Sequence, residues 1–165
     1  MITQSLRKGL LVAALHVAIV GSLGAKLLVD RATRPRVWAR AAPVDPDLPI
    51  RGRYVQLRIK AVPSDGLRSP DLQMVPIALL ERDGQLVAER ATSKVTARVV
   101  QRGGDFVAVL DEPLAYFIPE RVVDPSIRAP GEELWVEVTI PRAGAPRPIR
   151  LGVKKDGVLT PLDVK

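Results

Sequence analysis

Few side chains in this sequence have the chemistry that catalysis at neutral pH requires. The single histidine, His16, lies in an uncharged apolar stretch near the N-terminus, and the chain has no cysteine. The rest of the chain therefore cannot form a Ser-His-Asp triad or a Cys-His pair. A Ser-Lys dyad needs neither residue, and its candidates are Ser64 and the adjacent Ser93 and Lys94. Neighbours on a strand point to opposite faces, so Ser93 and Lys94 are poorly placed to act together.

The carboxylates give no stronger signal for chemistry. Asp45 with Asp47, and Glu132 with Glu133, have the spacing of ordinary turn and strand-entry residues. No glycine-rich loop of the phosphate-binding kind is present. We therefore expect a protein that is not an enzyme and that has no metal and no cofactor.

Size and composition favour one domain with an appendage. The chain has 165 residues, of which 47% are hydrophobic, enough for one substantial core. The formal charge is +7, but Arg7, Lys8 and Lys26 flank the apolar N-terminal stretch, and the remaining excess of positive charge is spread along the chain. Aromatic residues make up only 4%, and no basic cluster exceeds a pair beyond Arg34 to Arg40, so we expect no nucleic-acid partner.

The apolar stretch predicts a transmembrane helix that contacts membrane lipid. No charge occurs between Gly9 and Ala25, and Lys26 is close enough to the end to extend its ammonium to the membrane surface. A cleaved signal peptide is the alternative, because Ser22 and Gly24 offer small residues at a cleavage spacing. The expected organisation is a basic tail, a transmembrane helix, a tether and a β domain, over residues 1–8, 9–29, 30–36 and 37–165.

Charge does not fix the orientation of this helix. Two basic residues precede it, and four arginines follow it between Arg31 and Arg40. A literal count would place the β domain in the cytoplasm, although large domains often cross the membrane despite such charge. We expect a single-pass inner-membrane protein with the β domain in the periplasm, and the orientation stays open.

The body of the chain has the two-residue period of β-strands. Apolar and polar residues alternate through "RYVQLRIK" (53–60) and "LWVEVTI" (134–140). Asp83-Gly84, Gly103-Gly104 and Asp156-Gly157 each separate two such runs, which is typical of tight hairpins. These features predict an all-β fold, an antiparallel sandwich or partly closed barrel of about eight strands. Proline within a run favours an edge strand, so we expect an edge at Pro76.

Two motifs in the middle of the chain carry a family resemblance. The order Pro-Val-Asp-Pro at 43–46, then Arg-Gly-x-Tyr-Val-x-Leu at 51–57, resembles the bacterial family named for its GDYXXLXY motif. "AYFIPE" at Ala115 to Glu120 is similar to the second signature of that family. The chain departs from the first motif at Arg53, where the family has Asp, and at Ile59, where it has Tyr. The resemblance implies a membrane-anchored protein of uncharacterised activity, sometimes associated with polytopic membrane proteins.

These motifs also supply the candidate binding residues. We expect a purely structural corner beside two core aromatics; the alternative is a pocket where the end of the second motif meets the corner formed by the first. The expected function is that of a partner or accessory subunit of another membrane or envelope protein, with a small-ligand-binding module or a Ser-Lys hydrolase as alternatives. The candidate residues are Asp45, Arg51, Tyr54, Tyr116 and Glu120.

Overall fold

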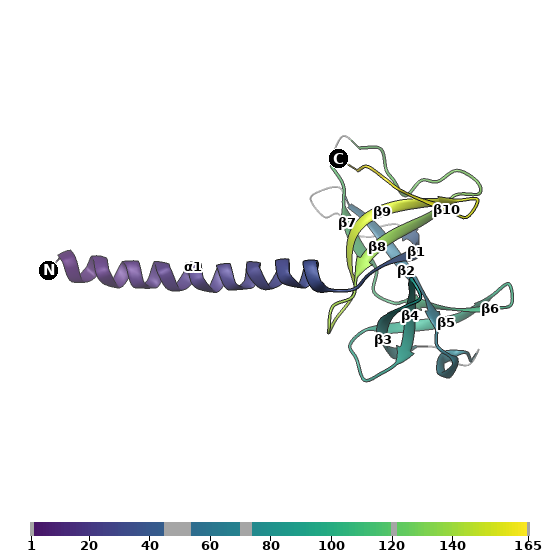
Figure 1. Cartoon of the computed structure of the whole chain (residues 1–165), viewed down its shortest axis with the longest axis horizontal. Coiled ribbons are helices and arrows are strands. Elements are labelled where there is room, and N and C mark those ends of the chain that lie inside the picture. Colours follow the sequence, from purple (N-terminus) through teal and green to yellow (C-terminus); the bar gives the residue numbers. More distant parts are fainter. Residues whose placement is uncertain (1, 45–53, 70–73, 120–121, 165) are drawn as a thin grey trace. The chain divides into compact units, whose positions relative to one another are not determined.

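The computed structural model describes residues 2–44, 54–69, 74–119 and 122–164 (Figure 1). The chain divides into two compact units, residues 1–34 and 35–165. The first unit is a single helix, and the second, called here the barrel unit, contains all the strands found in the described residues.

The helix α1 runs from Ile2 to Thr33. Its segment Arg7–Asp30 has 24 residues with a hydropathy of 1.9, so it is long and apolar enough to cross a membrane. A signal sequence near an N-terminus meets the same criteria. The helix is longer at both ends than the expected span of 9–29, because it includes residues of the basic tail and of the expected tether.

Polar side chains in the apolar part of α1 bond to the helix itself. Nδ1 of His16 lies 2.8 Å from the carbonyl oxygen of Val12, and the Ser22 hydroxyl donates to the carbonyl of Ile19 at 2.8 Å. An unsatisfied polar group costs several kcal/mol (~4–8) in a hydrocarbon environment. These local bonds therefore lower the cost of placing α1 in lipid.

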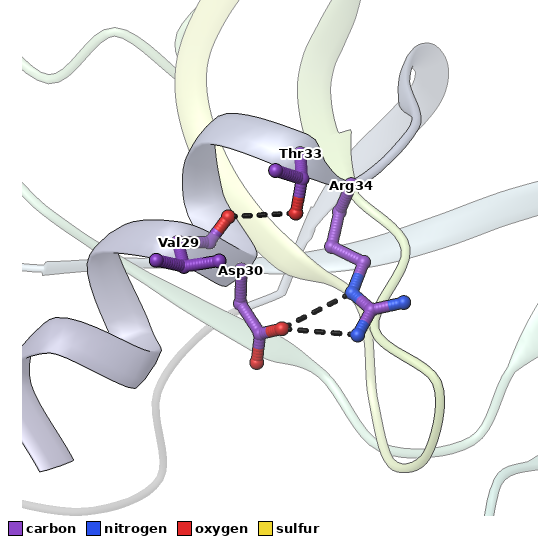
Figure 2. Close-up of polar contacts among 4 residues, drawn as sticks. All are labelled: Val29, Asp30, Thr33 and Arg34. Atoms are coloured by element: carbon purple, nitrogen blue, oxygen red, sulfur yellow. Dashed lines mark hydrogen bonds and ion pairs between the residues drawn. The ribbon is translucent and has the colours of Figure 1, made fainter. Parts of the chain in front are cut away.

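The C-terminal end of α1 is held by two side-chain contacts (Figure 2). Thr33 Oγ1 donates to the carbonyl of Val29 at 2.8 Å. Arg34 donates through Nε and Nη2 to one oxygen of Asp30, with the Nη2 contact at 3.0 Å. Such a pair, one turn apart, stabilises a helix by about 0.3–0.5 kcal/mol. The pair therefore gives a small stabilisation to the last turn of α1.

Ten strands and one short 3-10 helix make up the barrel unit in its described residues. In chain order they are β1 (Arg36–Val44), β2 (Tyr54–Pro63), η1 (Asp65–Leu67), β3 (Val75–Arg82), β4 (Gln85–Arg90), β5 (Thr96–Arg102), β6 (Asp105–Leu110), β7 (Leu114–Phe117), β8 (Glu133–Thr139), β9 (Arg147–Lys155) and β10 (Val158–Pro161).

Six of these strands form a closed barrel. They follow the order β1-β4-β3-β5-β6-β2, and β2 pairs back with β1 in antiparallel register. The contacts of β4 with β1 and with β2 are short parallel pairings. Strands β8, β9 and β10 extend from β1, and β7 extends from β2. The expected all-β class is thus confirmed, with a closed barrel plus extra strands. In Figure 1, β1 and β2 lie between the β8–β10 sheet and strands β3–β6.

The core follows from the alternation of apolar side chains along the strands. In β2 every second residue is buried, while the residues between them are more exposed; the buried ones are Val55, Leu57, Ile59, Ala61 and Pro63. Burial of one such leucine or isoleucine side chain stabilises the fold by about 1.5–3 kcal/mol. The largest side chains with almost no exposed surface come from barrel strands and added strands alike, including Leu57, Ile59, Ile77, Leu110, Val136, Val138 and Leu151.

The three predicted hairpin turns are confirmed. Asp83 and Asp156 have φ values of 52° and 49°, and each is followed by a glycine with positive φ. Gly103 and Gly104 have φ values of 59° and 93°. Two successive positive φ values are what a tight turn between right-twisted strands requires, and aspartate and glycine tolerate them better than other residues.

The prediction of an edge strand at Pro76 is wrong. β3 pairs with β4 on one side and with β5 on the other, so it is internal to the barrel. Pro76 is the second residue of the strand, and pairing with β5 is limited to Val75 and Pro76. The barrel therefore tolerates proline here, because the ladder with β5 ends before a long run of N–H donors is needed.

Candidate functional site

The structure brings the two sequence motifs side by side. β7 pairs with the start of β2 in a register that sets Tyr54 opposite Phe117, and Val55 opposite Tyr116. The rings of Tyr54 and Phe117 have centroids 6.2 Å apart and are tilted by 53°. Residues directly opposite share a face of the sheet, and successive residues alternate. Tyr54 and Tyr116 therefore lie on opposite faces and do not line one pocket.

Of the other candidate residues, the structure describes Tyr116 but not the remaining three. Tyr116 is half-buried against the core, and burial raises the pKa of its phenol above 10.0. Phe117 is 72% exposed, so the expectation of two core aromatics is wrong for this residue. Three of the predicted binding residues lie outside the described residues: Asp45, Arg51 and Glu120.

The serines do not form the geometry of a dyad. Ser93 Oγ accepts a hydrogen bond from the backbone N–H of Val95 at 2.9 Å. Ser64 precedes η1 and makes no side-chain capping bond there. Among the residues that the structure describes, no serine hydroxyl bonds to a lysine amine. The same residues contain no group of three or more carboxylates or histidines that could hold a metal ion.

A different part of the barrel unit has the features of a binding site. An open hollow of about 570 Å³ lies over β1 and β2, between the β8–β10 sheet and the β3–β4 and β5–β6 hairpins. We call it the tryptophan groove, because both tryptophans of the chain line it. Its defining side chains are Trp38, Arg40, Lys60, Phe106, Trp135 and Lys154.

Trp38 is held in the groove from two sides. Its ring packs on Gly152 of β9, where an added Cβ would stand only 2.8 Å from Cζ3. The guanidinium of Arg150 lies 5.3 Å from the ring centroid and also donates to Glu137 at 2.7 Å. A cation over an indole face contributes about 0.5–1 kcal/mol at a partly exposed site. Contacts with β9 therefore hold the Trp38 ring in this orientation.

Glu133 connects Arg40 to Trp135. One carboxylate oxygen lies 2.8 Å from Arg40 Nη2, and the other accepts from Trp135 Nε1 at 3.2 Å. The ammonium of Lys154 stands 4.8 Å from the Trp135 ring centroid. Both oxygens of Glu133 are thus engaged, and its charge is balanced by Arg40.

Lys60 contrasts with these paired groups. It stands opposite Arg40 in the β1–β2 register, and its side chain is half-buried. Within the described ranges, no carboxylate oxygen comes within 4.0 Å of its ammonium. Burial lowers the pKa of Lys60 below 10.5, Arg40 and Arg102 lower it further, and Glu133 opposes them. The groove thus contains a partly desolvated ammonium that has no ion-pair partner among the described residues.

Comparisons with protein-family models, with curated proteins and with solved structures found no match for this chain. Fold and site define the class: a closed six-stranded β-barrel with added strands, bearing an aromatic and cationic groove, on a chain with one apolar N-terminal helix. The resemblance to the GDYXXLXY-motif family stays a prediction.

Proposed function

We propose that this protein is a non-catalytic interaction module that is anchored in a membrane by α1 and binds another membrane or envelope protein through the barrel unit. The tryptophan groove carries the proposal. Tryptophan and arginine are enriched at protein interfaces, where burial of an aromatic side chain supplies much of the binding energy. A groove that holds Trp38 and Trp135 in fixed positions, with an unpaired Lys60 between apolar walls, is suited to such a role.

The proposed location of the barrel unit is the periplasmic side of a bacterial inner membrane. The family resemblance supports a membrane-anchored protein, and the apolar span Arg7–Asp30 supports the anchor. Protease accessibility tests the orientation: the barrel unit should be degraded when the outer membrane is opened while the inner membrane is intact. Degradation only after the inner membrane is lysed would place it in the cytoplasm.

Site-specific photo-cross-linking in native membranes tests the partner. A photoreactive amino acid at Leu159, which lines the groove, should give a discrete adduct with another membrane or envelope protein. The matched control is Leu80, which is 36% exposed and lies outside the groove. No adduct at Leu159, or the same adducts at both positions, would contradict the proposal.

A small-ligand-binding module is the second candidate. The volume of the groove, about 570 Å³, falls within the range of about 300–1,000 Å³ typical of small-molecule pockets. Native mass spectrometry of the full chain released from detergent distinguishes a bound small ligand from a protein partner. A stoichiometric small mass that is lost on Trp135→Ala would favour the ligand over the protein partner. A Ser-Lys hydrolase would instead be labelled by a fluorophosphonate probe, and Ser64→Ala or Ser93→Ala would abolish the labelling.

A further inference from the structure

Lys60 gives the tryptophan groove a preference for a negatively charged ligand. The cations Arg40 and Arg102 both disfavour the charged form of this lysine, and the carboxylate that favours it, Glu133, already bonds to Arg40 and Trp135. A half-buried ammonium beside other cations is stabilised by an incoming anion. The other titratable groups of the groove are Lys154, over the Trp135 ring, and Asp83 in an exposed turn at the rim.

The rest of the groove argues against a bare anion as the natural occupant. Val62, Phe106 and Leu159 contribute apolar surface from three different strands around the cations. A small inorganic anion would leave this surface in water. An occupant that combines one negative charge with apolar groups on either side matches both the charge and the walls.

A nucleic-acid strand or an anionic membrane surface fits less well. Both present many negative charges in a row, and they are recognised by runs of cations. In the groove, Asp83 and Glu133 stand among the three cations, and Arg40 is already paired with Glu133. Among the described residues, Lys60 is the groove ammonium that has neither an ion pair nor an aromatic ring contact, because Lys154 lies over Trp135, and one such group favours a single carboxylate.

We propose that the tryptophan groove binds an extended segment of a partner protein in which a glutamate or aspartate carboxylate pairs with Lys60 and apolar side chains flank it. The inference rests on the proposed function and names the chemistry of its partner. In an extended segment, side chains two positions apart point the same way, about 6.5–7 Å from each other. The carboxylate would then enter between the apolar walls while residues at the −2 and +2 positions contact them.

Two pools of end-blocked heptapeptides test the preference. Both carry random Leu, Val or Phe at the −2 and +2 positions, and they differ only in a central Glu or Gln. Binding to the full chain in phosphatidylcholine nanodiscs is followed by tryptophan fluorescence, because both tryptophans of the chain line the groove. An ammonium–carboxylate contact of this kind predicts about tenfold tighter binding of the Glu pool.

Substitutions of Lys60 test whether this residue causes the tighter binding of the Glu pool. Lys60→Met should make the two pools bind equally, whereas Lys60→Arg, which keeps the charge, should retain the preference. Lys94→Met is the matched control, because Lys94 is exposed and lies outside the groove. Two controls test other anionic ligands. Sodium acetate and inorganic phosphate represent small anions, and phosphatidylglycerol nanodiscs represent an anionic membrane. None of them should change the tryptophan fluorescence at the concentrations used for the peptides.

Each contrary outcome is informative. Equal binding of the Glu and Gln pools, or a preference that survives Lys60→Met, would overturn the role of Lys60. An equal response to acetate, phosphate or phosphatidylglycerol would overturn a peptide as the occupant. If only this inference fails, the Leu159 cross-link to a partner persists in native membranes; if the proposed function fails, that cross-link is absent.

Discussion

A methyl group added at Gly152 tests how closely the tryptophan groove is packed. Its carbon would stand 2.8 Å and 3.0 Å from Cζ3 and Cη2 of Trp38, and 3.2 Å from the carbonyl oxygen of Thr160. Favourable contacts between carbons lie at about 3.5–4.0 Å, so the indole must move away, and the β10 backbone must also shift by a few tenths of an ångström. The indole is rigid and lies beneath the guanidinium of Arg150. Overpacking of this kind costs about 1–3 kcal/mol, and we expect Gly152→Ala to lower the free energy of unfolding by that amount.

Urea unfolding of the full chain in detergent, followed by tryptophan fluorescence, measures this loss. Both tryptophans lie in the barrel unit, so the signal reports on that unit and not on α1. In a Trp38→Ala background the obstacle is removed, and Gly152→Ala should then cost less than about 0.5 kcal/mol, with Trp135 as the probe. Gly66→Ala is the matched control, because a Cβ there meets no atom within 4 Å.

Two results would refute the packing argument. One is a Gly152→Ala variant as stable as the unmodified chain. The other is an equal loss of stability with and without Trp38, which would mean that the methyl group clashes with β10 and not with the indole.

Three further predictions concern the core, the phenol and the helix. Leu57 is fully buried, so Leu57→Ala should cost about 2–5 kcal/mol in urea unfolding, whereas Leu80→Ala on the exposed side of β3 should cost about 1 kcal/mol or less. Because the pKa of Tyr116 is raised above 10.0, the folded state keeps a proton that the unfolded state loses; stability should fall as the pH rises through 10.0 toward the raised pKa, and Tyr116→Phe should reduce that fall. Val17→Arg places a charge within the apolar span at a cost of about 2.5–3.5 kcal/mol, and it should increase the fraction released by alkaline carbonate extraction relative to Val17→Leu.

Each of these predictions has a contrary outcome. Equal losses for Leu57→Ala and Leu80→Ala would contradict the assigned core. An unchanged slope of stability against alkaline pH in Tyr116→Phe would mean that burial of this phenol does not govern the titration. Full membrane retention of Val17→Arg would show that α1 does not provide the anchorage.

The local geometry of the barrel was predictable where one residue type controls the backbone. Aspartate–glycine and glycine–glycine pairs located the hairpin turns, because few other residues accept two successive positive φ values. Alternation of large apolar residues located β2 and β8. β1 was not predicted as a strand, because its inward positions after Val37 are the alanines Ala39 and Ala41, which give a weak alternation. β7 was missed because it has only four residues.

The groove was not predictable from spacing along the chain. Trp38 and Trp135 are brought together because β1 pairs with β8, with Arg40 opposite Trp135 in that register. Lys60 joins them through the β1–β2 ladder. One signal was available: the alternation put Trp135 on the outward face of its strand, where a large aromatic side chain favours a binding surface over the core. The tyrosine pair failed as a site because two residues expected to converge, Tyr54 and Tyr116, belong to opposite faces.

The central claim is that another protein covers the tryptophan groove in the native membrane. The chain has no cysteine, so a single cysteine can be introduced at Val62, which is 40% exposed and lines the groove, or at Leu80, 36% exposed and outside it. Maleimide labelling rates are then compared between permeabilised native membranes and the purified protein in nanodiscs. The account predicts that Val62→Cys reacts slowly in native membranes and rapidly after purification, while Leu80→Cys reacts equally in both. Equal, rapid labelling of Val62→Cys in both preparations would contradict it.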